Sequence, residues 1–329
     1  MSVFLTGASG FLGGRLAQVL IERGEEVFAL TRPGAQMGHL SHLPVRIVAG
    51  DLGDVAALTE AVRDVSHIFH CAACATDWAP MDTFYGANVL GTQNLLAAAR
   101  EATNLERFVH ISTCDVYGYP RIPCDESHPL IDTGLPYNQT KCLAEAAVWK
   151  AQGDFGLPIT ILRPATIYGP RGKDFVVQVA EMLRQGLMLK IDSGSATGGW
   201  AYVDNVVDAV LLASSREEAV GEAFNVADGT GATWSEYLDA FASELGRRPA
   251  RINLPFGAAM TLARLMEAPH RYLKVPGRPL LTQHGVYLLG VDQEFPITKA
   301  RRVLGFEPKV GLREGISRSV RWLKDTGRE

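Results

Sequence analysis

A tyrosine and a lysine four residues apart could carry out acid–base chemistry in this 329-residue sequence. Tyr137 and Lys141 lie in the segment Tyr-Asn-Gln-Thr-Lys. Side chains at positions i and i+4 share one face of a helix. A nearby ammonium lowers the pKa of a phenol, so we expect Tyr137 to exchange a proton near neutral pH. Hydride transfer to or from a carbonyl carbon needs such a group, and Lys141 could also bind a nicotinamide ribose.

Hydroxyl groups follow a predicted strand at 107–112, upstream of this pair. The segment from Ile111 to Gly118 is ISTCDVYG. Ligands of doubly wound sheets bind at the carboxyl ends of strands. We therefore expect a hydroxyl here to hold the substrate oxygen beside Tyr137. Cys114 and Asp115 are candidate substrate contacts.

A glycine-rich turn predicts a dinucleotide site at the N-terminus. Gly7, Gly10 and Gly13 lie between an apolar run at 1–5 and a helical pattern at 15–23. Such glycines permit a tight turn, a close approach to a diphosphate and close packing of helix on strand. The diphosphate would bind at the N-terminus of the helix.

Two further segments bear on which cofactor binds. The second predicted strand, 26–30, is followed by Thr31-Arg32-Pro33, with no carboxylate to bind the ribose hydroxyls of NAD. Arg32 could pair with a 2′-phosphate, so NADP(H) is favoured over NAD(H), although a solvated surface arginine is the alternative. Asp51 and Leu52 follow the third strand, where they would meet the adenine ring. Asp51 could instead cap a helix.

Alternating strands and helices step through the first half of the chain. This pattern predicts a Rossmann-type doubly wound parallel sheet with a smaller C-terminal α/β substrate-binding lobe. We place the dinucleotide domain at 1–170 and the lobe at 171–329, with segments such as 200–226 partly rejoining the core. A long helix is expected over 88–102, Asp204 is expected to cap a helix from Asn205, and prolines including Pro269 are expected to break the lobe into short pieces.

Composition excludes several classes of protein. Hydrophobic residues make up 47% and charged residues 21%, which excludes disordered and coiled-coil chains. A net charge of −4 argues against a broad nucleic-acid surface. The 5 cysteines show no framework or metal spacing, so we expect reduced thiols, no metal and a cytoplasmic protein. We expect no signal peptide and no transmembrane span.

Six segments together resemble the extended short-chain dehydrogenases/reductases over essentially the whole chain. They are TGASGFLG, HCAA from His70, NVLGTQNLL from Asn88, STCDVYG, YNQTK and LRPATIYGP from Leu162. The resemblance implies that Thr113, Tyr137 and Lys141 are catalytic. It implies a homodimer formed through the helices at 88–102 and 137–152. The implied cofactor contacts are Gly7, Ser9, Gly10, Phe11, Leu12, Gly13, Cys71, Ala72, Ala73, Asn88, Tyr137, Lys141, Pro164 and Ile167.

Later motifs resemble one branch of that family, the 3β-hydroxysteroid dehydrogenase-like group. Tyr202-Val203-Asp204-Asn205-Val206 and the tail from Pro279 to Ile316 match its pattern. Sugar-nucleotide epimerases and dehydratases usually carry a diphosphate-clamping arginine where this chain has Gly198-Gly199. We therefore expect reversible hydride transfer at a secondary alcohol or ketone of a bulky apolar substrate, either sterol-like, with decarboxylation where a 4-carboxylate is present, or a 3-oxo acid. A sugar-nucleotide epimerase or dehydratase with a recycled cofactor is the alternative.

Two features of the sequence leave alternatives open. Residues 256–266 could form an amphipathic lid over an apolar substrate with peripheral membrane contact, or an ordinary packed helix. Trp78 could line the substrate pocket or pack in the core.

Overall fold

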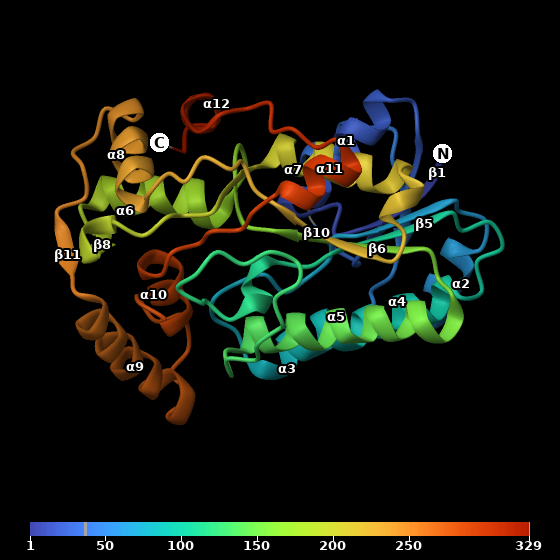
Figure 1. The fold of residues 1–329 in the computed structure, drawn as a ribbon, viewed down its shortest axis with the longest axis horizontal. Coiled ribbons are helices and arrows are strands. Elements are labelled where there is room, and N and C mark those ends of the chain that lie inside the picture. The colour runs from blue at the N-terminus through green and yellow to red at the C-terminus, as the bar shows by residue number, and fades with distance from the viewer. Residues whose placement is uncertain (36–37, 329) are drawn as a thin grey trace.

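A parallel sheet of seven strands forms the larger part of the molecule (Figure 1). The computed structural model describes residues 1–35 and 38–328. The strand order is β10-β6-β5-β4-β1-β2-β3. The seven strands are β1 Ser2–Thr6, β2 Glu26–Thr31, β3 Arg46–Ala49, β4 His67–His70, β5 Arg107–Ile111, β6 Ile159–Pro164 and β10 Glu222–Val226.

Helices cover both faces of this sheet (Figure 1). On one face lie α2 Val55–Val62, α4 Gly91–Ala99 and α5 Pro136–Phe155, and on the other lie α1 Phe11–Glu22, α7 Val203–Ser215 and α11 Thr298–Leu304. Short helical turns are α3 Met81–Phe84, η1 Gly38–His42, η2 Tyr85–Leu90, η3 Cys114–Tyr117 and η6 Glu217–Ala219. This is the doubly wound arrangement predicted from the alternating pattern.

The smaller lobe lies beyond the carboxyl ends of the strands (Figure 1). Its helices are α6 Gln178–Gln185, α8 Trp234–Glu244, α9 Phe256–Tyr272, α10 Gln283–Gly290 and α12 Leu312–Asp325, with turns η4 Lys173–Val177 and η5 Asp192–Gly194. Two small parallel pairs complete the fold, β8 Leu189–Ile191 with β11 Ile252–Leu254 and β7 Thr166–Tyr168 with β9 Trp200–Tyr202.

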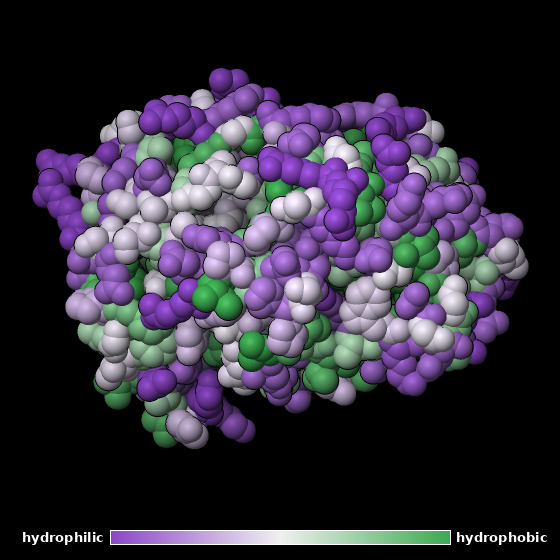
Figure 2. Space-filling view, in the orientation of Figure 1, coloured by the Kyte–Doolittle hydropathy of each residue, from purple (hydrophilic) through white to green (hydrophobic). Residues whose placement is uncertain are grey.

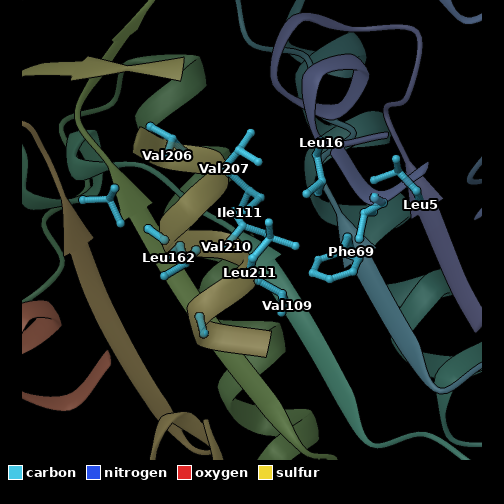
Figure 3. Close-up of a cluster of buried hydrophobic side chains, with 14 of the residues drawn as sticks. Leu5, Leu16, Phe69, Val109, Ile111, Leu162, Val206, Val207, Val210 and Leu211 are labelled. Atoms are coloured by element: carbon cyan, nitrogen blue, oxygen red, sulfur yellow. The ribbon is translucent and has the colours of Figure 1, made fainter. Parts of the chain in front are cut away.

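The chain leaves the main sheet after β6 and returns to it at β10. Helix α7 packs its apolar side chains on β5 and β6, as Val206, Val207 and Val210 beside Val109 and Leu162 illustrate (Figure 3). β10 pairs with β6 in parallel register. The sheet core is therefore built partly from residues beyond 200. These residues anchor the smaller lobe to the sheet.

Three local predictions were wrong in detail. The helix expected over 88–102 begins earlier, because α3 from Met81 continues through the π-helical turn η2 into α4, and it ends at Ala99. Asp204 does not cap α7, because the helix starts at Val203 and the Asp204 carboxylate instead pairs with Arg15 at 2.6 Å. Pro269 does not interrupt the chain's helical structure, because it lies in the last turn of α9, which continues to Tyr272.

A buried ion pair fixes α5 to the sheet. The guanidinium of Arg163 on β6 pairs with the carboxylate of Glu145 on α5, and both side chains are almost completely buried. Glu145 also accepts hydrogen bonds from Ser112 at 2.7 Å and Trp149 at 3.3 Å. Arg163 donates in addition to the hydroxyl of Tyr117 at 2.8 Å. Each charge thus depends on the other to compensate its loss of hydration.

Replacing Glu145 with alanine should lower the free energy of unfolding by about 3–5 kcal/mol, because Arg163 would remain buried without its counter-ion. Chemical denaturation monitored by circular dichroism measures this loss. Glu181→Ala, which removes an exposed partner of Arg184, is the matched control and should leave the denaturation midpoint nearly unchanged. Equal effects of the two substitutions would contradict the structural role of the buried pair.

Candidate active site

The turn between β1 and α1 has no room for side chains at two of its glycines. Gly7 has φ +75°, and a Cβ there would lie 2.7 Å from the backbone nitrogen of Ala72. A Cβ at Gly13 would lie 2.3 Å from the carbonyl oxygen of Gly7. The first glycine therefore permits the turn, and the third lets α1 pack directly on the end of β1.

The N-terminus of α1 is suited to binding an anion. No side chain caps the helix at Gly10. The first-turn N–H groups of an α-helix have no intrahelical acceptors, and the helix dipole favours negative charge at this end. The open cradle of Gly7 to Gly13 thus fits the diphosphate of a dinucleotide. The cavity wall here includes Gly7, Ser9, Gly10, Phe11, Leu12 and Gly13.

A chain of buried hydrogen bonds links the end of β1 to β4 and to the helical segment η2–α4. The Thr6 hydroxyl accepts from the N–H of Ala72 at 3.1 Å and lies 2.8 Å from His70 Nδ1. His70 Nε2 lies 2.9 Å from the Thr92 hydroxyl, which donates to the carbonyl of Asn88 at 2.6 Å. Burial, aided by the Lys141 charge, lowers the pKa of His70 to about 3. His70 is therefore a neutral structural link.

Thr113, Tyr137 and Lys141 lie on one wall of the same cavity. The ammonium of Lys141 is buried and donates to the carbonyl of Ile111 at 2.7 Å. Burial lowers the pKa of Lys141 to about 8, against the opposing attraction of Glu145. The carbonyl at the end of β5 thus fixes the lysine beside the residues that precede Thr113.

The electrostatic environment of Tyr137 is opposite to the one expected. Burial and the carboxylate of Asp115 raise the pKa of Tyr137, while a hydrogen bond with Thr113 acts in the lowering direction. The prediction that Lys141 lowers this pKa is therefore wrong for these residues. Tyr137 is held as a neutral phenol, which is the form that donates a proton.

His284 is a residue of the site that the sequence did not indicate. It lies in the first turn of α10, and its Nε2 is 3.2 Å from Oδ2 of Asp115. Its ring stacks on that of Tyr137 with the centroids 5.7 Å apart. No spacing in the sequence links Asp115 to a histidine 169 residues later, so only the tertiary structure could reveal the pair.

The remaining predicted site residues divide into two groups. Those that line the cavity are Cys71, Ala73, Cys114, Asp115, Pro164 and Ile167. Those outside the lining are Arg32, Asp51, Leu52, Ala72, Trp78 and Asn88. Asn88 supports the wall indirectly, because its side chain accepts from the N–H of Cys74 at 2.7 Å and donates to Thr140 at 3.0 Å.

Asp51 and Trp78 have local partners of their own. Asp51 accepts from the N–H of Gly53 at 2.7 Å, and the cap of α2 is Asp54. Trp78 lies edge-on to His270 of α9, with the ring centroids 6.0 Å apart. Trp78 thus joins the loop after β4 to the smaller lobe.

The cavity has a volume of about 970 Å³ and extends from the glycine turn into the smaller lobe. Its far wall is mostly apolar and includes Phe175, Met182, Met188, Trp234, Leu288 and Leu289. Nearer Tyr137, the segment 278–284 closes one side. Arg278 and Thr282 bind Asp77 at 2.6 and 2.8 Å, which ties this segment to the loop after β4.

Residues 1–35 and 38–328 hold neither a candidate metal site nor a membrane-spanning helix. No group of three or more His, Cys, Asp or Glu side chains is placed to hold a metal ion. No helix in this part of the chain is long and apolar enough to cross a membrane.

Comparison with known proteins identifies the family. Residues 3–227 match the model of the NAD dependent epimerase/dehydratase family. A 4-hydroxy-2-methyl-3-oxo-4-farnesyl-3,4-dihydroquinoline-1-oxide ketoreductase of Stigmatella aurantiaca is 34% identical, with 96% of this chain and 95% of that protein covered. A 2-alkyl-3-oxoalkanoate reductase of Stenotrophomonas maltophilia is 31% identical, with coverage of 97% and 98%.

Two other matches bear on the branch and on the fold. A 3beta-hydroxysteroid-dehydrogenase/decarboxylase of Arabidopsis thaliana is 30% identical over 84% of this chain and 66% of that protein. The solved structure of a UDP-glucuronic acid 4-epimerase from Bacillus cereus with NAD has the same fold, with a TM-score of 0.80, 22% identity and coverage of 99% of each chain. The chain therefore belongs to the NAD-dependent epimerase/dehydratase family, in the branch of NAD(P)-dependent reductases and dehydrogenases that resemble 3β-hydroxysteroid dehydrogenases.

Proposed function

We propose that this enzyme reduces a ketone on a bulky apolar substrate with NADP(H) as the preferred cofactor. The observation that carries the proposal is the placement of Thr113, Tyr137 and Lys141 on one wall of a large cavity with a mostly apolar far wall. Bulky apolar ligands gain most of their affinity from such walls, and a few polar groups set their orientation.

The chemistry follows from the side chains on that wall. A bound nicotinamide dinucleotide supplies the hydride. The hydroxyls of Thr113 and Tyr137 bind the carbonyl oxygen, and Tyr137 donates its phenolic proton to that oxygen as the alcohol forms. Lys141, held at the cavity wall by the carbonyl of Ile111, would hydrogen-bond the nicotinamide ribose. The cradle of Gly7 to Gly13 binds the diphosphate.

Burial and the charge around Tyr137 favour its protonated form. Oxidation of an alcohol requires the phenolate, whereas burial and Asp115 keep the pKa of Tyr137 above its ordinary value. At neutral pH the residue is therefore an acid ready to donate. The protonated phenol is the form that ketone reduction requires.

The region where epimerases carry a clamping arginine also supports this choice. A Cβ at Gly198 would lie 2.3 Å from the ring of Trp200, so the backbone is packed against that ring. No cation takes the place of the clamp at Gly198 or Gly199. A sugar-nucleotide epimerase or dehydratase remains the competing function, and its substrates belong in the test.

The names of the relatives offer two classes of ketone. One relative reduces a ring ketone with a neighbouring hydroxyl group, and another reduces a 3-oxo acid. A third acts on a 3β-hydroxysteroid and decarboxylates. All three substrate classes fit the proposal of a bulky apolar ketone or alcohol.

NADP(H) is proposed because of Arg32. Arg32 follows β2 directly, is exposed and makes no ion pair within the described ranges 1–35 and 38–328. Its guanidinium is thus available for a 2′-phosphate.

We further propose a cytoplasmic homodimer. All 5 cysteines lie among the described residues and are unpaired, which fits a reducing compartment. Exposed Leu90 and Leu143 lie along η2 and α5, the face that the family resemblance assigns to the dimer. Burial of these side chains against a second copy would stabilise the pair.

Peripheral membrane contact is proposed for the end of the smaller lobe. Exposed apolar side chains and cations alternate along α9 and the segment after it, seen at the lower left of Figure 2. The apolar members are Leu262, Leu265, Tyr272, Leu273, Val275 and Leu280, and the cations are Arg264, Arg271, Lys274 and Arg278. Glu267, the single acid from 256 to 280, is buried. Such a surface suits an anionic bilayer.

Tyr137→Phe should reduce ketone turnover by at least about a hundredfold, because the proton donor is lost, while NADPH binding is retained. The measurement is NADPH absorbance against a panel of bulky 3-oxo acids and hydroxy ketones, with 3β-hydroxysterols and NADP or NAD for the reverse reaction. Tyr85→Phe, at a partly exposed site outside the cavity lining, is the control. Conversion of a UDP-sugar without net cofactor turnover would transfer the assignment to the epimerases.

Arg32→Ala should weaken NADPH binding by about ten- to a hundredfold and leave NADH binding unchanged, since a charge-assisted contact to the 2′-phosphate is removed. Fluorescence titration with each cofactor gives both dissociation constants. Arg23→Ala removes another exposed arginine and should change neither value. Equal losses for NADPH and NADH would count against a 2′-phosphate contact.

Leu265→Asp and Leu273→Asp should each reduce binding to phosphatidylglycerol vesicles at least severalfold, because apolar contact and favourable charge are both lost. Co-sedimentation with phosphatidylglycerol and with phosphatidylcholine vesicles measures the effect. Leu187→Asp changes an exposed leucine elsewhere and should bind as the parent does. Failure of the parent protein to bind anionic vesicles would refute the membrane contact.

A further inference from the structure

The polar end of the cavity is built around Asp115. Asp115 is two residues beyond Thr113, and its N–H donates to the Thr113 hydroxyl at 3.2 Å. The two side chains therefore belong to the same short turn, η3, at the end of β5. Asp115 lines the cavity together with Thr113 and Tyr137. The Asp115 carboxylate thus faces the same cavity as the two hydroxyls that would bind the carbonyl oxygen.

His284 holds the carboxylate in place from the opposite lobe. Its Nε2 lies 3.2 Å from Asp115 Oδ2, and its ring packs against Tyr137 and Tyr119, with centroid separations of 5.7 and 6.0 Å. A carboxylate has lone pairs for about four hydrogen bonds. His284 and the nearby Tyr119 hydroxyl together use part of this capacity and leave Asp115 able to accept from a substrate.

One neighbouring polar atom lacks a partner in this cluster. Nδ1 of His284 is buried and has no hydrogen-bond partner within the described part of the chain. The hydroxyl of Tyr119 lies close to Asp115, and burial together with that carboxylate raises the pKa of Tyr119. Both residues are more than nine-tenths buried. Buried polar groups normally have partners, and exceptions call for an explanation such as a ligand.

Carboxylates are the chief charges that act on the Tyr137 phenol, whereas the Lys141 ammonium, on the same wall, is directed to the carbonyl of Ile111. Segment 278–284 brings an arginine and a histidine here, and both already contact carboxylates, Arg278 with Asp77 and His284 with Asp115. The charges that act on the Tyr137 phenol are chiefly those of Asp115 and Asp174, both negative. A substrate acid bound beside the carbonyl would therefore meet like charge, whereas an O–H would meet an acceptor.

We propose that Asp115, positioned by His284, is a hydrogen-bond-accepting subsite that selects ketones with a hydroxyl group next to the carbonyl and disfavours free 3-oxo acids. The inference rests on the proposed ketone reduction and narrows its substrate class. Asp115 touches the substrate, whereas His284 acts through Asp115 as a positioning residue. The neighbouring hydroxyl is bound and does not react. The hydride would still come from the nicotinamide and the proton from Tyr137.

Three matched ring compounds test the subsite: 2-hydroxycyclododecanone, cyclododecanone and 2-oxocyclododecane-1-carboxylate. The parent protein should reduce the hydroxy ketone with a kcat/KM about ten- to a hundredfold above that of the plain ketone, the range for a hydrogen bond to a charged group. The carboxylate should be the poorest substrate. Tryptophan fluorescence with NADPH bound gives the three dissociation constants and should show the same order.

In Asp115→Asn, the kcat/KM values for the plain and the hydroxylated ketone should lie within a few-fold of each other. The kcat/KM for the carboxylate should rise relative to both. His284→Gln should lower the preference partway. Asp82→Asn is the control, because it removes an exposed carboxylate outside the cavity lining, and it should keep the parent's order of preference.

A second readout separates this role from a merely structural one. Asp115 raises the pKa of Tyr137. The rate of alcohol oxidation should therefore begin to rise at a lower pH in Asp115→Asn than in the parent protein. The other groups around the phenol stay in place in this variant, namely Asp174, Cys74, Lys141, Thr113 and His284. Loss of folding in Asp115→Asn is detected by circular dichroism, and His284→Gln then tests the preference.

The possible failures are distinguishable. No turnover of any of the three ketones, in a chain that binds NADPH, contradicts the proposed reduction, and the dissociation constants still test the subsite. Turnover without a preference for the hydroxy ketone, or a preference unchanged in both Asp115→Asn and His284→Gln, overturns the subsite alone. Tighter binding of the carboxylate than of the hydroxy ketone also overturns it.

Discussion

The buried pair of Glu145 and Arg163 is the interaction on which the catalytic wall depends. Glu145 lies one helical turn beyond Lys141, and Ser112, which donates to it, immediately precedes Thr113. Arg163 extends the contact through Tyr117 to Asn225 on β10. One ion pair thus fixes α5, β5 and β6 relative to one another. A buried pair adds little net stability over apolar packing, but each member is costly to remove. The pair therefore serves mainly to hold the catalytic wall in position.

Much of this arrangement could be predicted from local sequence. The glycine spacing, the alternation of strands and helices, and the i, i+4 spacing of Tyr137 and Lys141 depend on neighbours along the chain. The boundaries that were wrong depend on tertiary contacts instead. Asp204 does not cap α7 because Arg15 binds it across the α1–α7 interface. Pro269 is tolerated because a proline near a helix end sacrifices few hydrogen bonds.

The protonation chemistry of Tyr137 could not be predicted in this way. The spacing to Lys141 suggested attraction between ammonium and phenolate, yet the ammonium of Lys141 is directed to the carbonyl of Ile111. Burial and Asp115 then dominate the pKa of Tyr137. The sign of such a shift is set by distance and desolvation, which a sequence does not record. His284 was missed for the same reason, since its partner lies in a different lobe.

The contacts that close the cavity also define its chemistry. Asp77 and Asp115 each bind a residue of segment 278–284, across 201 and 169 positions of the chain. Closing such long loops costs configurational entropy, so these contacts persist only because the lobe is already held by β10 and its apolar core. Asp115 therefore serves the wall and the reacting centre at once. A substitution that relaxes specificity at this carboxylate also loosens the wall, which couples substrate choice to the closure of the cavity.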